Sequence, residues 1–138
     1  MSRILAIDFG QKKSGIAVTD ELQMIASPLT TVASSKLIDF LKDYISKEKV
    51  SVMVVGEPKT MDNKASDSTK YIAPFVGRLK KAFPNMTIDR MDERFTSRMA
   101  FQAMIDGGLG KKARQNKELV DAISASLILQ SYMEFKKI

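Results

Sequence analysis

The sequence contains no histidine and no cysteine among its 138 residues. Without an imidazole or a thiolate, the chain lacks the commonest general base and the sulfur nucleophile of enzymes. Its only soft metal ligands are methionine thioethers. Any chemistry on phosphate esters would therefore depend on carboxylates that hold a hard cation such as Mg²⁺ or Mn²⁺. The lack of cysteine also excludes a disulfide framework.

Long apolar runs are also missing. No stretch approaches the roughly 20 residues of a membrane span, and the run Ile4 to Ile7 is too short for the core of a signal peptide. The sequence therefore predicts a soluble cytoplasmic protein with no membrane partner.

The length and composition predict one domain, residues 1–138, with a sizeable core, because 44% of the residues are hydrophobic. The formal net charge of +6 is compatible with a polyanionic partner, although it is equally explained by ordinary solubility charge.

Short apolar segments predict strands. The segments Ile4–Phe9 and Gly15–Thr19 are expected as neighbouring strands, followed by Met24–Val32. Pro28 inside the third segment places that strand at a sheet edge, because proline cannot donate to a ladder. Val50–Val55 predicts a central strand covered on both faces, and Met86–Met91 a further strand.

Helical spacing of apolar residues predicts the remaining elements. A helix capped by Ser34 or Ser35 should bury Leu37 and Leu41. A second helix should start near Tyr71 or kink at Pro74. Two more are expected from Thr96 to about Asp106 and from about Lys117 to Phe135. The resulting order predicts an α/β fold, in which a mixed sheet begins with an antiparallel meander and carries helices on its faces.

Three carboxylates stand at positions that favour function. Asp8 ends a buried strand, Glu93 follows another, and Asp121 heads the apolar stripe of the last helix. If these three met within about 5 Å, each like-charge pair would cost roughly 3 kcal/mol at an effective dielectric near 20. Bound divalent cations would relieve that repulsion, and two ions about 3.5–4 Å apart can promote phosphodiester hydrolysis.

Each acid also has a structural alternative. Asp8 could cap the turn at Gly10, Asp121 could complement the dipole of its helix, and Glu93 could form a surface ion pair. Asp92 competes with Glu93, because neighbours on a strand end point in opposite directions. Glu57 could join the metal site or serve a turn before Pro58.

Basic residues flank these acids and are candidate phosphate contacts, although solvated loops would explain them equally well. They are Lys12, Lys13, Arg94, Lys111, Lys112, Arg114 and Lys117.

Four motifs occur in an order that resembles a known family: Asp8-Phe9-Gly10 with Gly15-Ile16-Ala17, Val55-Gly56-Glu57-Pro58, Asp92 through Ser97, and Val120-Asp121-Ala122. They resemble the YqgF family of RuvX-like, Holliday-junction-resolvase-like nucleases, also described as the pre-16S rRNA nuclease. The resemblance covers essentially the whole chain.

The resemblance implies an RNase H-like fold with a five-stranded mixed sheet between helices. It also implies a metal-dependent endonuclease, using Mg²⁺ or Mn²⁺ held by Asp8, Glu93 and Asp121, that matures the 5′ end of precursor 16S rRNA. Ribosome association, and a monomer or weak homodimer, are expected. Lys13 stands where the family usually has arginine, which would weaken a bidentate phosphate contact. Glu57 replaces a usually apolar residue.

Other functions remain open from the sequence. One is a Holliday-junction resolvase acting on branched DNA, and another is a non-catalytic nucleic-acid- or ribosome-binding module. An ATP-dependent sugar-kinase-like or actin-like phosphotransferase shares the acid–glycine opening but requires two such domains, and 138 residues supply one.

Overall fold

The computed structural model describes residues 2–10, 12–57, 69–92 and 117–136. Along the chain, the strands are β1 (Arg3–Asp8), β2 (Lys13–Thr19), β3 (Ala26–Ala33), β4 (Val50–Glu57) and β5 (Thr87–Asp92). The helices are the short 3₁₀ turn η1 (Ser34–Lys36), α1 (Leu37–Lys47), α2 (Thr69–Ala82) and α5 (Lys117–Lys136). The predicted helix between Thr96 and Asp106 lies outside the described residues.

The strands form one five-stranded sheet in the order β3-β2-β1-β4-β5. The β1–β2 and β2–β3 pairs are antiparallel, whereas β1–β4 and β4–β5 are parallel. The predicted meander followed by parallel strands is therefore confirmed. β3 lies at one edge, as Pro28 predicts, and β4 is internal, as its continuous apolar run predicts.

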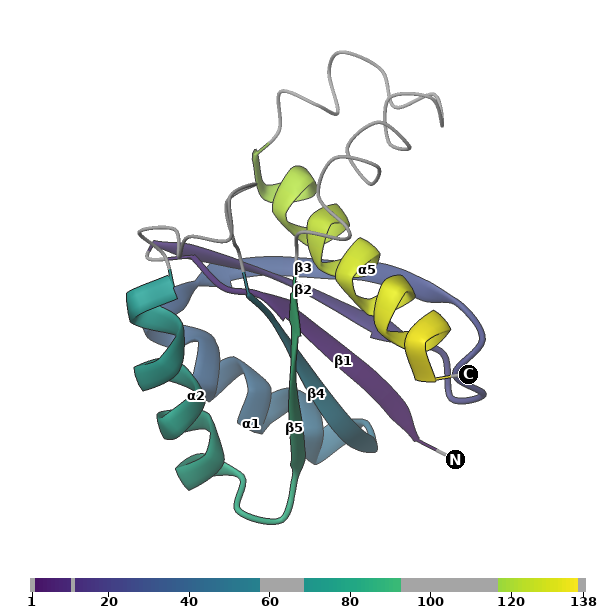
Figure 1. Ribbon diagram of the computed structural model, residues 1–138. Coiled ribbons are helices and arrows are strands. Elements are labelled where there is room, and N and C mark those ends of the chain that lie inside the picture. The colour runs from purple at the N-terminus through teal and green to yellow at the C-terminus, as the bar shows by residue number, and fades with distance from the viewer. Residues whose placement is uncertain (1, 11, 58–68, 93–116, 137–138) are drawn as a thin grey trace.

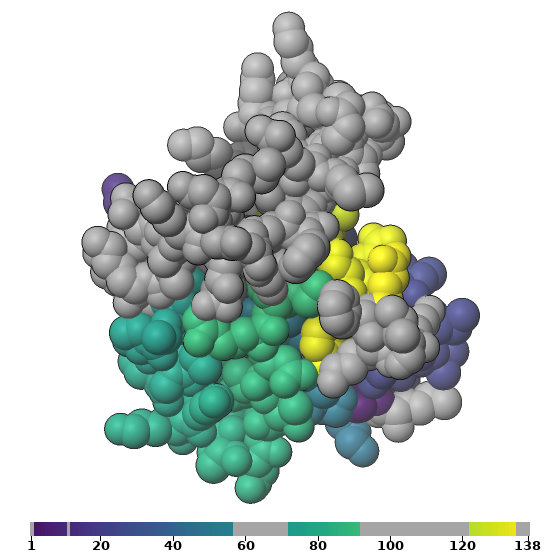
Figure 2. Space-filling model, in the orientation of Figure 1, coloured from purple at the N-terminus to yellow at the C-terminus, as the bar shows by residue number. Residues whose placement is uncertain are grey.

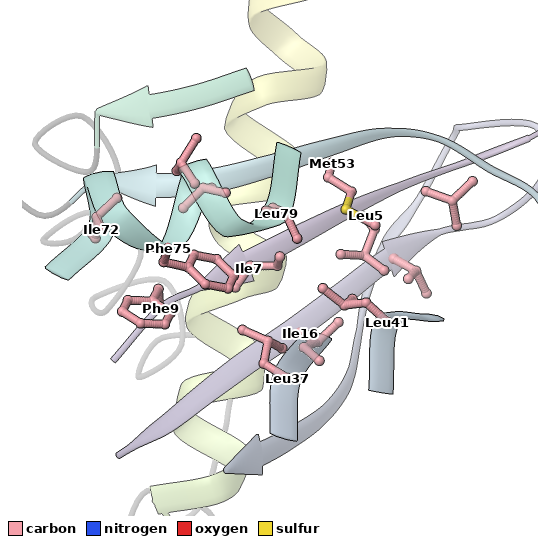
Figure 3. Close-up of a cluster of buried hydrophobic side chains, with 14 residues drawn as sticks. Leu5, Ile7, Phe9, Ile16, Leu37, Leu41, Met53, Ile72, Phe75 and Leu79 are labelled. Atoms are coloured by element: carbon pink, nitrogen blue, oxygen red, sulfur yellow. The ribbon is translucent and has the colours of Figure 1, made fainter. Parts of the chain in front are cut away.

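Helices cover both faces of the sheet (Figure 1). On one face, α1 and α2 pack against alternate strand residues to form a cluster that we call the α1/α2 core (Figure 3). Its largest fully buried side chains include Leu5, Ile7, Ile16, Leu37, Leu41, Met53, Ile72, Phe75 and Leu79.

On the opposite face, α5 packs against the intervening strand residues. This second cluster, the α5 core, contains Ile4, Ala6, Ala17, Val54, Met91, Ala125, Ile128, Leu129, Tyr132 and Met133. The alternation of β1 between the two cores follows from the period of two along a strand. It fixes the face on which each residue of β1 lies.

The predicted serine cap is wrong, and the start of the second helix lies slightly earlier than predicted. The hydroxyl of Ser34 does not cap α1, because the N-cap position is Lys36 and no side chain caps it. Ser34 instead opens η1, and its hydroxyl donates to the carbonyl of Gly10. Helix α2 begins at Thr69, two residues before the predicted start near Tyr71, and Pro74 lies inside its second turn.

The turn between β2 and β3 is capped by the carboxylate of Asp20, and β3 is shorter than predicted. The Asp20 carboxylate accepts hydrogen bonds from the backbone N–H groups of Met24 and Ile25, both at 2.8 Å. These bonds, that from Ile25 first, hold the pKa of Asp20 below its usual value. Gln23, with φ of 56°, supplies the left-handed residue of the turn. Met24 and Ile25 are consequently not part of β3, contrary to the sequence prediction.

Candidate functional site

Three of the acidic residues named in the sequence analysis lie at one end of the sheet. The parallel strands β1, β4 and β5 end there at Asp8, Glu57 and Asp92, and Glu57 pairs with Asp92 in register. The first turn of α5 lies toward the same end (Figure 1). Ligands of open α/β sheets bind beyond the carboxyl ends of the strands, so this edge is the candidate site.

Asp8 lies on the α5 face of the sheet. Ile4 and Ala6, four and two residues earlier, belong to the α5 core, whereas Ile7 and Phe9 belong to the α1/α2 core. Strand alternation therefore directs Asp8 to the same face as Ala6. Asp8 is half-buried, which is the exposure expected of a carboxylate at the margin of a site rather than in bulk water.

The backbone around Asp8 is held from the other face by an aromatic contact. The ring of Phe9 stacks on Phe75 of α2 with a centroid separation of 4.4 Å and an interplanar angle of 14° (Figure 3). Phe9 is 7% exposed and Phe75 is 1% exposed. Such a stacked, buried pair resists displacement of the strand end, so Asp8 occupies a well-anchored position.

The connection from β1 to β2 follows Asp8 directly and is tightly turned. A Cβ atom built on Gly10 would lie 2.5 Å from the carbonyl oxygen of Lys13, a distance that real Cβ atoms do not adopt. Gly10 is therefore required by close backbone approach. Lys12, on this connection, and Lys13, the first residue of β2, are both exposed. Two candidate phosphate contacts thus follow Asp8 within five residues.

The remaining predicted site residues cannot be placed as side chains. Asp121 and Lys117 lie in the first part of α5, and Glu57 and Asp92 end their strands, but only their backbone positions are described. The others, which lie outside the described residues, are Glu93, Arg94, Lys111, Lys112 and Arg114. Within the described part of the chain, no three acidic side chains form a group that could hold a metal ion.

The sequence did not predict the hydrogen bond that joins α5 to β5. The hydroxyl of Tyr132 donates to the carboxylate of Asp89. Burial, followed by the hydrogen bond to Asp89 and by the charge of Asp89, raises the pKa of Tyr132 above its usual value. The only sequence signal was the place of Tyr132 on the stripe that Asp121 heads.

Two serines beside the Gly10 turn were also missed as site residues. Ser14 is fully buried, and its hydroxyl lies 2.7 Å from that of Ser34. A serine at the start of an otherwise apolar strand could have indicated a buried hydrogen bond, because buried hydroxyls almost always have a partner. Its partner could not be read from the sequence.

Comparison with known proteins identifies close relatives. The family model described as "RuvX: Holliday junction resolvase" matches residues 2–135. A protein of Flavobacterium psychrophilum named "Putative pre-16S rRNA nuclease" is 60% identical over 136 residues, covering 99% of each chain. A protein of the same name from Phocaeicola vulgatus is 57% identical over 137 residues, again covering 99% of each.

A solved structure shares the fold. The Thermus thermophilus RuvC chain, in complex with a Holliday junction substrate, superposes with a TM-score of 0.58 over 97% of each chain. The identity of 15% restricts this likeness to the fold. It confirms the RNase H-like architecture that the sequence resemblance implies.

Proposed function

Because this chain belongs to the RuvX family, we propose that it is a metal-dependent endonuclease that hydrolyses phosphodiester bonds of structured nucleic acid. The proposed substrate is precursor 16S rRNA, after the name that its relatives carry. The observation that carries this proposal is the position of Asp8. Its half-buried carboxylate ends β1 on the α5 face, at the edge where the parallel strands end and α5 begins.

The phase of β5 supports Glu93 as the second acid. Asp89 is bonded to Tyr132 of α5, and Met91 packs in the α5 core. Odd-numbered residues of β5 therefore lie on the α5 face, and continuation of the strand period assigns position 93 to that face. The same period assigns Asp92 and Glu57 to the opposite face, since Met53 and Val55 belong to the α1/α2 core. We therefore favour Glu93 over these two acids.

The phase of α5 supports Asp121 as the third acid. Ala125, Ile128 and Tyr132 are buried against the sheet at 0%, 1% and 6% exposure. Position 121 precedes Ala125 by four residues, so it falls on the same helix face. It also lies in the first turns of α5, toward the end of the sheet where Asp8 is found.

Three carboxylates of this kind fit Mg²⁺ or Mn²⁺, which prefer hard oxygen ligands, and the chain has no histidine or cysteine to favour a softer metal. When bound as a pair, such ions lower the pKa of water and stabilise charge on the leaving oxygen. In this proposal Asp8, Glu93 and Asp121 would hold these ions. The Phe9–Phe75 stack keeps Asp8 in place.

The basic residues orient the nucleic acid in this proposal. Lys12 and Lys13 bind backbone phosphates beside Asp8, since both are exposed and follow it closely, one on the connection and the other at the start of β2. The other basic residues that the sequence nominates as phosphate contacts, and that this proposal retains as such, are Arg94, Lys111, Lys112, Arg114 and Lys117. Phosphate contacts fix the position of the substrate without reading its sequence, so selectivity comes from the shape of the nucleic acid.

Branched DNA is the second candidate substrate, because the family model is described as a Holliday junction resolvase. Incubation of the protein with precursor 16S rRNA and with a four-way DNA junction, in Mg²⁺ or Mn²⁺, separates the two. Cleavage of the RNA at its 5′ precursor segment is the expected result. Cleavage of the junction alone would assign the resolvase activity instead.

The catalytic proposal is tested by Asp8→Asn, which keeps the shape of the side chain but removes its charge. We expect cleavage to be lost while the circular dichroism spectrum and salt-sensitive RNA binding persist. Asp39→Asn, which neutralises an exposed acid on α1, is the matched control and should cleave normally. A folded Asp8→Asn protein that cuts as fast as wild type would refute the proposal, and metal-independent binding without cleavage by wild type would favour a binding module.

A further inference from the structure

A closed ring of hydrogen bonds lies beside the turn that follows Asp8. The hydroxyl of Ser34 donates to the carbonyl of Gly10 at 2.6 Å. The hydroxyls of Ser14 and Ser34 are 2.7 Å apart, and the backbone N–H of Gly10 points to the Ser14 oxygen at 3.4 Å. The ring therefore runs from the backbone N–H of Gly10, through the hydroxyls of Ser14 and Ser34, to the backbone carbonyl of Gly10.

The direction of each bond follows from the number of protons. A serine hydroxyl has one proton, and the Ser34 hydroxyl donates its proton to the carbonyl of Gly10. Ser14 must therefore donate to Ser34, and Ser14 in turn accepts from the Gly10 N–H. Each hydroxyl donates once and accepts once. Because Ser14 is fully buried, breaking the ring would leave a polar group without a hydrogen-bond partner at a place that water does not reach. Such an unpaired buried group is unfavourable.

The ring also fixes the next part of the connection. The backbone N–H of Ser34 donates to the carbonyl of Lys12 at 2.9 Å. Ser34 thus binds Gly10 with its side chain and Lys12 with its main chain, although it lies at the end of β3, on the far side of β2 from β1. Ser14 precedes Gly15, the residue that pairs with Asp8 in the sheet. The two serines therefore bond to the backbone of Gly10 and Lys12, in the connection that directly follows Asp8.

We propose that Ser14 and Ser34 are positioning residues of the nuclease site, holding Asp8 and the phosphate-binding Lys12 and Lys13 in their working arrangement. This inference rests on the proposed function. Neither hydroxyl touches the substrate; each acts through the backbone of Gly10 and Lys12. Small displacements of positioned groups can reduce reaction rates by about 100-fold. A loosened turn is therefore expected to slow cleavage even when the protein stays folded.

The test uses Ser34→Ala, Ser14→Ala and the double variant in cleavage and binding assays. Each single variant should reduce kcat/KM roughly 10- to 100-fold. It should also weaken the salt dependence of RNA binding, because Lys12 and Lys13 no longer reach their phosphates together. The double variant should be little worse than either single one, since either change opens the ring.

Two controls separate positioning from general stability. Ser35→Ala removes an exposed hydroxyl from the same 3₁₀ turn and should behave as wild type. Ile45→Val trims a partly buried α1 side chain in the α1/α2 core, so it lowers stability away from the turn and should retain activity. Ser34→Thr keeps a hydroxyl at a half-buried position and should restore most of the rate that Ser34→Ala loses.

The outcomes distinguish the two proposals. If wild type cleaves and Asp8→Asn does not, yet Ser34→Ala and Ser14→Ala match wild type in rate and salt dependence, the positioning role is wrong and the nuclease proposal stands. Loss of activity that merely follows the melting temperature, with Ile45→Val falling on the same line, would also overturn the positioning role. If wild type itself does not cleave, both proposals fail.

Discussion

Gly10 and Gly77 differ in the space around their α-carbons. A methyl group on Gly10 would collide with the backbone oxygen of Lys13, and that oxygen belongs to a strand rather than to a flexible side chain. A methyl group on Gly77, in the middle of α2, meets nothing within 4 Å. The two positions therefore form a natural pair for testing how tightly the turn beside Asp8 is built.

We predict opposite effects of alanine at these two glycines. Gly10→Ala should lower the free energy of unfolding by about 1–3 kcal/mol, the usual cost of overpacking. Gly77→Ala should raise it by about 0.5–1 kcal/mol, because alanine loses less entropy in a helix than glycine. Urea denaturation followed by circular dichroism measures both. A neutral Gly10→Ala variant would show that the turn relaxes freely.

At the scale of secondary structure, the bond from Tyr132 to Asp89 joins the C-terminal helix to an edge strand. Figure 2 shows the surface of β5 (green) beside that of α5 (yellow). α5 also packs on β1, β2 and β3, so this bond fixes its position relative to β5. Of the proposed acids, Asp121 lies in α5, and Glu93 is the residue that follows β5 in the sequence.

We predict that Tyr132→Phe lowers the free energy of unfolding by about 1.5–3 kcal/mol at neutral pH, the range for hydrogen bonds to charged groups. Because the folded-state pKa of Tyr132 lies above its unfolded value of 10.0, this contribution is complete below pH 10 and declines as the pH rises further. Urea melts from pH 7 to pH 11 should therefore show wild type losing its advantage over Tyr132→Phe.

Tyr44→Phe provides the control for that measurement. It removes a hydroxyl from a tyrosine that stacks on Phe40 in α1, so it leaves the link between α5 and β5 intact. Its effect on stability at neutral pH should be smaller than that of Tyr132→Phe. An equal loss in the two variants would mean that the Asp89 bond contributes little.

Much of the element order could be predicted because local patterns determine it. The apolar run Val50–Val55 predicted an internal strand, and Pro28 predicted an edge strand, since each depends only on burial or on a missing donor. The role of Ser34 could not be predicted in this way. Its hydroxyl has an acceptor in Gly10, 24 residues earlier, and a rule based on neighbouring residues assigned it to the nearest helix.

The candidate site was predictable in part for the same reason. The face of Asp8 follows from the alternation of β1, and the stripe Ala125, Ile128 and Tyr132 gave the buried face of α5 correctly. The convergence of Asp8, Glu93 and Asp121 stays a prediction, since Glu93 and the side chain of Asp121 lie outside the described residues. The Tyr132–Asp89 and Ser14–Ser34 bonds depend on tertiary packing that spacing does not encode.

At the scale of the whole molecule, the net charge of +6 favours association with a polyanion. Among the described residues, no helix is long and apolar enough to cross a membrane. Charge alone does not locate the binding surface, because lysines lie on several elements. The proposed function places the decisive ones beside Asp8.

We predict that the Lys12→Ala/Lys13→Ala double variant lowers the dependence of RNA affinity on salt. Each phosphate contact contributes about one unit to the slope of log K against log salt concentration, so the slope should fall by about 2. The matched control is Lys80→Ala/Lys81→Ala, a pair of exposed lysines in the last turn of α2. An equal change in the control would indicate diffuse attraction rather than a defined surface.

The order of elements along the chain governs when each face of the sheet can be completed. The helices that complete the α1/α2 core are α1 and α2, which are synthesised early. In the α5 core, Ile4, Ala6 and Ala17 stay uncovered until α5 is synthesised. During translation the nascent sheet therefore has one finished face and one open apolar face. The proposed carboxylate site cannot assemble before α5 docks, so a nuclease of this design is inactive while its own α5 is still being translated.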